Sequence, residues 1–151
     1  MDNENIVSWL RRRITPEEYE NIRHEWITHS KAEDARDIPG LMSTLTEDCV
    51  YIYPQTGERW DGHEGATKFY TDLLTAVPDI HFDLQTIVIG PQGVYEEARA
   101  TGTPVTEWQG NPPTGEPFDL TISIYFPWDP EKKKFQGERM FIMGKTGKMP
   151  L

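Results

Sequence analysis

The sequence contains a single cysteine among 151 residues, so no disulfide bond can form within the chain. Cys49 lies beside Val50 in an apolar run, which indicates a buried structural thiol rather than a nucleophile. No apolar run approaches the length of a membrane-spanning helix, and residues 1–13 lack the apolar stretch of a secretory signal. We therefore expect a cytoplasmic protein with no membrane partner.

Basic residues are also scarce. The chain has 15 Lys and Arg residues against 25 Asp and Glu residues, and its formal net charge is −10. Because nucleic acids and anionic membranes attract Lys and Arg, we do not expect this acidic chain to bind nucleic acid. The two basic runs, residues 11–13 and 132–134, are short and are interpreted as solvated surface.

The motifs of several enzyme classes are missing from the sequence. It has no phosphate-binding glycine loop, no zinc-ligand spacing and no nucleophile elbow. The segment "GPQG" is interpreted as a hairpin turn rather than a phosphate site. Nothing in the sequence therefore indicates a metal or nucleotide site.

What the chain does contain is enough for one domain. Its residues are 36% apolar and 11% aromatic, which supports one hydrophobic core at this length. Residues 1–14 are interpreted as an N-terminal extension with a short amphipathic turn, residues 15–143 as the domain, and residues 144–151 as a flexible C-terminal tail.

The hydrophobic periodicity predicts helices first and strands later. Thr15 followed by Pro16 and two glutamates is typical of a helix start, and this helix is expected to reach about Ala35. Helices followed by hairpin-linked strands indicate an α+β fold in which the helices pack on a strongly bent, mainly antiparallel sheet. Further helices are predicted for residues 37–45 and 63–76, and strands for residues 49–54, 80–90, 94–108, 117–128 and 135–143.

The first predicted helix carries an unusual stripe. Ile22 and Trp26 form an apolar face that continues through His29 and Glu33, because residues four apart lie on one side of a helix. An imidazole and a carboxyl group removed from water at the inner end of such a stripe suit general acid–base chemistry. The alternative is that both lie half-solvated at the rim of a pocket, where Glu33 only holds the helix end.

Three motifs, taken in order, resemble those of one family. They are "VPDIHFDLQTIVIG", "GTPVTEWQGNPPTGEP" and "QGERMFI", and the similarity extends over residues 16–141. In these motifs the chain is similar to the SnoaL-like polyketide cyclases, which have the cone-shaped α+β fold of the nuclear-transport-factor-like superfamily. The resemblance implies a bent sheet that encloses an apolar pocket for a hydrophobic small molecule. It also implies acid–base chemistry without a metal or organic cofactor, and a homodimer formed through the open face of the sheet.

The sequence departs from the family pattern at several positions. Pro104 stands where the family has its usual active-site histidine. Arg99 matches the arginine of the related limonene epoxide hydrolases by position, whereas Thr101 and Met140 occupy the positions of their two acids. The resemblance therefore leaves three functions open: an enzyme of the cyclase, isomerase or dehydratase type, a protein that only binds a small molecule in the same pocket, and an epoxide hydrolase.

The expected catalytic residues are His29, Glu33, Tyr53 and Asp119. The resemblance places Asp119 close to the catalytic aspartate of the cyclases, just after the "PPTG" loop. If its strand face points inward, Asp119 lines the pocket; if not, it is a solvated strand residue. Asp119 or His29 would remove a proton next to a carbonyl group, and Tyr53 would stabilise the resulting oxyanion. Glu33 would orient His29.

A second set of residues is expected to contact the substrate. Tyr51 shares a strand face with Tyr53, and the alternative for both is a core tyrosine whose hydroxyl bonds the backbone. The alternative to substrate contact for Arg99 is a simple ion pair with a nearby acid. Glu138 is either a pocket acid or the partner of Arg99. The full set is Trp26, Tyr51, Trp60, His63, Arg99, Glu138 and Met140.

Overall fold

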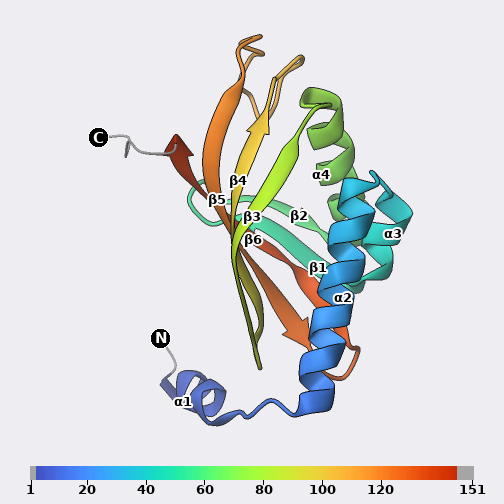
Figure 1. Cartoon of the computed structure of the whole chain (residues 1–151), viewed down its shortest axis with the longest axis vertical. Helices are drawn as coiled ribbons and strands as arrows, with labels where there is room; N and C mark the ends of the chain where they lie inside the picture. The colour runs from blue at the N-terminus through green and yellow to red at the C-terminus, as the bar shows by residue number, and fades with distance from the viewer. Residues whose placement is uncertain (1–2, 146–151) are drawn as a thin grey trace.

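The computed structural model describes residues 3–145 and has the predicted α+β fold (Figure 1). Its strands form one open sheet in the order β2-β1-β6-β5-β4-β3, in which the β1–β6 pair is parallel and the other pairs are antiparallel. The helices are α1 (Asn3–Arg11), α2 (Pro16–Asp34), α3 (Ile38–Ser43) and α4 (Gly62–Ala76). The strands are β1 (Leu45–Tyr53), β2 (Glu58–Asp61), β3 (His81–Gly90), β4 (Gly93–Gly102), β5 (Phe118–Asp129) and β6 (Lys134–Lys145).

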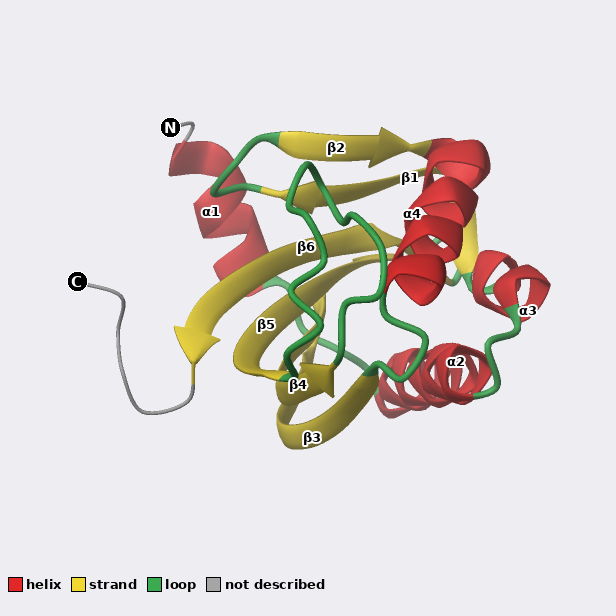
Figure 2. Ribbon diagram, turned by 90° about the horizontal axis from the view of Figure 1, so that it is seen from above, coloured by secondary structure: helices red, strands yellow, loops and turns green. Residues whose placement is uncertain are grey.

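Helices α2, α3 and α4 lie together on one side of the curved sheet, and α1 lies apart from them (Figure 2). We call the side that these three helices cover the inner face and the opposite side the outer face. The long loop between β4 and β5 crosses the open end of the inner side (Figure 2). The predicted cone with helices on a bent, mainly antiparallel sheet is therefore confirmed. Within residues 3–145, every helix is too short or too polar to span a membrane.

The helix starts follow the predicted capping chemistry. Thr15 Oγ1 accepts a hydrogen bond from the backbone N–H of Glu18 at 3.1 Å, and Pro16 occupies the first helical turn. Asp37 caps α3 in the same way, since its Oδ1 accepts from the N–H of Gly40 at 3.0 Å. These caps fix where α2 begins and where the chain turns back toward the sheet.

Two strand predictions were wrong. The segment before α4, for which no strand was predicted, contains β2, whose residue Trp60 pairs with Tyr51 of β1. The predicted strand 94–108 ends early, at Gly102. The N–H of Thr103 donates to Asp79 Oδ1 at 2.8 Å instead of to a neighbouring strand, and Pro104 has no N–H to donate. The backbone therefore leaves the sheet there and becomes the β4–β5 loop.

The ends of the chain also differ from expectation. The N-terminal extension contains the helix α1 rather than a single turn. Strand β6 continues to Lys145, two residues into the predicted tail, and residues 146–151 of that tail lie outside the described residues.

A glycine sets the contact between β1 and β6. Gly137 has φ of 106°, and a methyl group added to its Cα would overlap the backbone of Val50 on β1. The β1–β6 register shifts between Leu45 and Val50, so the two strands bulge where they come closest. This geometry positions the next residue, Glu138, opposite Tyr51.

Gly137→Ala is expected to destabilise the fold by at least about 1–3 kcal/mol, because a left-handed backbone conformation is strained for a residue with a Cβ and the added methyl group would also overlap the backbone of Val50. Urea unfolding of the variant would measure the change. Gly57→Ala provides a control for the backbone strain alone, because Gly57 has φ of 80° and its added methyl group would meet no atom within 4 Å. Equal losses in the two variants would contradict the role given to the Val50 contact.

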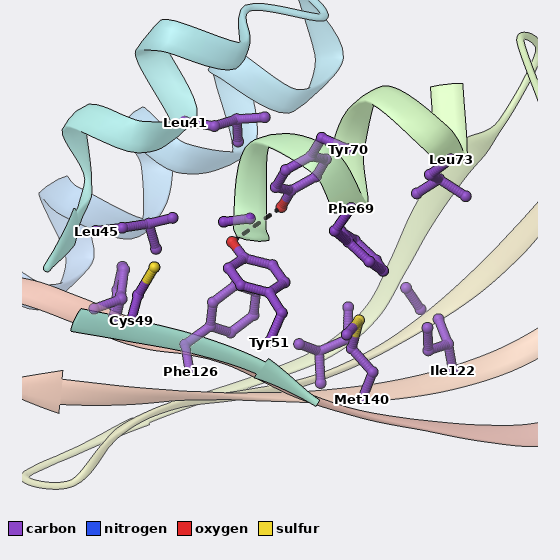
Figure 3. Close-up of a cluster of buried hydrophobic side chains, with 14 of the residues drawn as sticks. Leu41, Leu45, Cys49, Tyr51, Phe69, Tyr70, Leu73, Ile122, Phe126 and Met140 are labelled. Atoms are coloured by element: carbon purple, nitrogen blue, oxygen red, sulfur yellow. Dashed lines mark hydrogen bonds between the residues drawn. The ribbon is translucent and has the colours of Figure 1, made fainter. Parts of the chain in front are cut away.

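The core lies between α4 and the inner face (Figure 3). Tyr51 and Phe69 contact each other with ring centroids 5.3 Å apart, and Tyr70 lies 5.6 Å from Tyr51. Leu41 and Leu45 close the cluster at the α3 end. Aromatic rings therefore form the part of the core beneath α4, and two tyrosine hydroxyls are buried inside it.

Candidate active site

The sheet, α4 and the β4–β5 loop enclose a cavity of about 240 Å³, which we call the main cavity. Its wall is mostly apolar, and its ionisable residues are Glu33, Tyr53 and Glu138. The apolar and loop residues of the wall are Phe69, Leu73, Val77, Ile80, Phe82, Ala100, Pro104, Trp108, Asn111, Pro112, Thr114, Phe118, Leu120, Ile122, Ile124, Met140 and Ile142. A volume of this size fits a small hydrophobic molecule, since a cavity of about 150 Å³ holds benzene.

His29 lies behind this wall, with only 2% of its surface exposed. Thr44 donates its hydroxyl hydrogen to the carbonyl of Leu41 at 2.7 Å, so its oxygen accepts from His29 Nδ1 at 2.7 Å. Nδ1 therefore carries a hydrogen, and Nε2 is the nitrogen that can gain or lose a proton.

The partner of that nitrogen is Glu138 on β6. Nε2 of His29 lies 3.1 Å from Glu138 Oε1, and the Tyr70 hydroxyl donates to the same oxygen at 2.8 Å. Glu138 is 3% exposed. A contact of this length between a nitrogen and a carboxyl oxygen requires one proton, which resides either on the imidazole or on the carboxyl group. His29 and Glu138 therefore form a buried pair that shares a proton at the wall of the main cavity.

A tyrosine pair extends the network. The Tyr51 hydroxyl lies 3.3 Å from the Tyr70 hydroxyl (Figure 3). Because Tyr70 gives its hydrogen to Glu138, Tyr51 donates to Tyr70. Burial, and then the negative charge of Glu138, raise the pKa of both phenols well above their ordinary value. Both hydroxyls therefore remain donors that hold Glu138 in place.

Two further acids lie close to this pair. Removal from water, and then the charge of Glu138, raise the pKa of Glu33 to about 8, although the neighbouring His29 opposes the shift. The same two causes raise the pKa of Glu96 to about 7. A hydrogen bond that Trp26 Nε1 donates to Glu96 at 3.1 Å lowers this pKa and so opposes the shift. Glu33 and Glu96 also line a second cavity of about 210 Å³, and Glu33 and Phe82 line both cavities.

Tyr53 is part of the main cavity wall. Its ring lies 6.0 Å from Trp60 and 6.4 Å from Phe69, centroid to centroid. Burial raises the pKa of Tyr53 above the ordinary range of a phenol. Its hydroxyl therefore keeps its hydrogen at neutral pH and can donate it to an oxygen of a bound molecule.

Asp119 and Arg99 lie on the outer face, away from the main cavity. Arg99 Nε and Nη2 bind the two carboxylate oxygens of Asp119 at 2.8 and 2.6 Å in an exposed ion pair. The expectation that Asp119 faces the pocket is thus wrong, because the apolar residues Leu120 and Ile122 take the inner side of β5. The position of Arg99 also removes it from any epoxide-opening arrangement in this cavity.

The other expected contact residues fall into three groups. Met140 and Glu138 line the main cavity. Trp26 lines the second cavity, and Tyr51 is fully buried beneath the wall. Two others lie near the start of α4: Trp60 packs on Phe69 at 5.0 Å, and His63 Nε2 lies 3.2 Å from the carbonyl oxygen of Leu45.

Tyr70, Thr44 and Glu96 were missed as site residues. Tyr70 lies in the predicted helix 63–76, and a tyrosine hydroxyl on the apolar side of a helix is itself a signal, because it needs a partner when it is buried. Glu96 alternates with the buried residues Val94 and Ala98, which indicates the inner face. Within residues 3–145, no group of three or more His, Cys, Asp or Glu side chains has an arrangement that could hold a metal ion.

Replacing Glu33 by glutamine is expected to change how stability depends on pH. In the unfolded chain the pKa of Glu33 is near its ordinary 4.5, whereas in the folded chain it is about 8. Between these values the unfolded state binds fewer protons, so the stability of the wild type falls as pH rises through this interval. Glu33→Gln removes that contribution.

Urea unfolding near both ends of this interval, at about pH 5 and about pH 8, would measure the change. The variant should gain stability relative to the wild type at the higher pH. Glu97→Gln is the matched control, because Glu97 follows Glu96 on the same strand and accepts a hydrogen bond from Tyr95 at 3.0 Å on the outer face. An identical loss of stability with pH in Glu33→Gln and in the wild type would refute the burial of this acid.

Comparisons with known proteins agree with this fold and site. The SnoaL-like domain family matches residues 25–128, more than half of the chain. The chain therefore belongs to the SnoaL-like family, whose scaffold is the nuclear-transport-factor-like α+β cone. No match is found among curated protein sequences.

Solved structures share the fold at low sequence identity. A candidate SnoaL-like polyketide cyclase from Jannaschia sp. CCS1 is 17% identical, with a TM-score of 0.74 over 87% of this chain and 90% of that one. IdmH, a candidate polyketide cyclase from Streptomyces antibioticus, is 22% identical, with a TM-score of 0.64 over 80% and 91%. An NTF2-like protein of unknown function from Burkholderia pseudomallei K96243 is 14% identical, with a TM-score of 0.67 over 81% and 90%.

Proposed function

We propose that this protein is a cofactor-independent acid–base enzyme, of the cyclase, isomerase or dehydratase type, that acts on a hydrophobic small molecule in the main cavity. The observation that carries the proposal is the His29–Glu138 pair, which shares one proton and ends at the wall of an apolar cavity. A carboxylate with a buried proton partner is a suitable base for a carbon acid. The low dielectric of the cavity strengthens the electrostatic effects on which such catalysis depends.

In the proposed reaction Glu138 removes a proton from the carbon next to a carbonyl group of the substrate. The electrons of the C–H bond move into the carbonyl and form an enolate, and the Tyr53 hydroxyl donates a hydrogen bond to the developing oxyanion. The proton is returned to the same or another carbon, or to a leaving oxygen. His29 acts through Glu138 as a positioning residue, because it holds the carboxyl group and stabilises its charge.

Exchange of the α-hydrogens of cyclic ketones with D₂O, followed by NMR, tests the proposal. The wild type should accelerate exchange of a two-ring ketone such as 2-tetralone above the rate in buffer alone. Binding of the ketones without any accelerated exchange would favour a protein that only binds its ligand in this cavity. Incorporation of oxygen from labelled water into a diol, when an epoxide is supplied, would instead indicate epoxide hydrolysis.

We also propose that the chain forms a homodimer through the outer face. Val88, Tyr95 and Met143 lie on this face and expose 56%, 38% and 48% of their surfaces. Burying such a patch against a second copy would be favourable. Light scattering coupled to size exclusion should give the mass of two chains for the wild type, and Val88→Asp should shift the mass toward one chain. A monomeric wild type would contradict this proposal.

A further inference from the structure

Two acids line the main cavity, Glu33 and Glu138. Glu33 is the one that has no role in the proposed reaction. It projects from the last turns of α2 and lines both the main cavity and the second cavity. No hydrogen bond to its carboxyl group is found within the part of the chain that the structure describes. A carboxyl group in this position is available to a ligand.

The charges around Glu33 do not balance. Four carboxyl groups, those of Glu33, Asp34, Glu96 and Glu138, lie near a single base, His29. One imidazolium can neutralise one carboxylate, so the acids outnumber the cation. Within the part of the chain that the structure describes, the residues that line the main cavity include no Lys, Arg or His. An anionic ligand would thus meet no opposite charge, whereas a cationic ligand would meet a carboxylate.

Aromatic rings form another part of the same wall. The rings of Tyr53, Phe69 and Trp108 all line the main cavity, and Phe69 lies 6.4 Å from Tyr53 and 5.7 Å from Trp108, centroid to centroid. The faces of such rings attract ammonium groups, and the attraction is stronger when water is excluded. The rings therefore favour the same kind of ligand as the surplus acids.

We propose that the ligand of the main cavity is a hydrophobic molecule with one protonated amine, which Glu33 binds as a carboxylate while Glu138 acts elsewhere on the molecule. This inference rests on the proposed function, because it assigns the two acids of one cavity to binding and to chemistry respectively. The cavity volume of about 240 Å³ suits a ligand of one or two rings.

Binding of such a ligand should release a proton. The pKa of Glu33 is about 8, because removal from water and the charges of Glu138, Glu96 and Asp34 raise it against the opposing effect of His29, so the group is protonated at neutral pH. A bound ammonium group would lower that pKa, and Glu33 would lose its proton on binding. The affinity for amines should therefore rise as pH increases toward about 8, and the affinity for neutral analogues should not.

Isothermal titration calorimetry with matched probes tests the inference. The probes are an amine, an alcohol and a carboxylate on each of two skeletons: benzylamine, benzyl alcohol and phenylacetate, and the 2-amino, 2-hydroxy and 2-carboxy derivatives of tetralin. In the wild type the amine should bind about tenfold to a hundredfold more tightly than its alcohol, as expected for a charge-assisted contact. Titrations in buffers of different ionisation heat should show release of up to about one proton per amine.

Glu33→Gln should remove both the preference for amines and the proton release, whereas Glu97→Gln, the same change on the outer face, should leave both intact. Circular dichroism of each variant would verify folding. The inference is overturned if neither amine binds, if the alcohols bind as tightly as the amines, or if Glu33→Gln keeps the preference. Ketone exchange without an amine preference would refute the inference alone, and an amine preference without ketone exchange would refute the proposed reaction.

Discussion

Glu138→Gln is expected to lower the rate of ketone α-exchange by about 10²–10⁴-fold, the usual contribution of a general base. The amide has nearly the shape of the carboxyl group and still accepts from Tyr70, but it cannot take up a proton from the substrate carbon. The exchange rate measured by NMR, together with the circular dichroism of the variant, separates lost chemistry from lost folding.

The matched control is Asp119→Asn, the same chemical change on the outer face. This ion pair with Arg99 is exposed, so its loss should cost only about 0–1 kcal/mol of stability and leave exchange unchanged. If Asp119→Asn abolished exchange while Glu138→Gln did not, the catalytic assignment would have to be reversed.

Phe69→Ala is expected to destabilise the fold by about 3–5 kcal/mol, which is the common cost of deleting a buried phenylalanine ring. Phe69 is 3% exposed, and its ring contacts Tyr51, Trp60 and Tyr70 at centroid distances of 5.3, 5.0 and 5.3 Å. The truncation would leave an unfilled space that rigid aromatic neighbours cannot close. Guanidinium unfolding would measure the loss.

Val105→Ala is the comparison, since Val105 lies in the β4–β5 loop, is 55% exposed and should change the free energy of unfolding by no more than about 0.5 kcal/mol. A loss below about 1 kcal/mol for Phe69→Ala would mean that Trp108 and its loop move inward to fill the space.

Local patterns were sufficient for the helices α2, α3 and α4 and for the placement of His29 and Glu33 on one helix face. The spacing of His29 and Glu33 predicted a shared helix face, and the structure places both beside one cluster of acids. The start of α2 was also predicted, because capping depends only on neighbouring residues such as Thr15 and Pro16.

Local sequence patterns could not predict which residues far apart in the chain would contact each other. The contact between His29 and Glu138 joins residues 109 positions apart, and that between Tyr70 and Glu138 joins residues 68 apart. Nothing in either segment specifies the partner, because the contact depends on the register of β6 against β1 and on the close approach of Gly137 to Val50.

The face of β5 was decidable but was left open. Leu120, Ile122 and Ile124 alternate with Asp119, and the more apolar set takes the inner side. The family position of Asp119 argued in the opposite direction. In this case the alternation of the strand was the better guide to where the side chain points.

The parallel pairing of β1 with β6 also has a consequence for how the protein forms during synthesis. Strand β6, the last of the described strands in sequence, occupies a central place in the sheet, between β1 and β5. A nascent chain that still lacks this strand has neither the middle of its sheet nor Glu138. Contacts between segments so far apart in sequence form slowly. We therefore expect folding to finish late. Glu138, the proposed general base, would reach the site in the same step that completes the sheet.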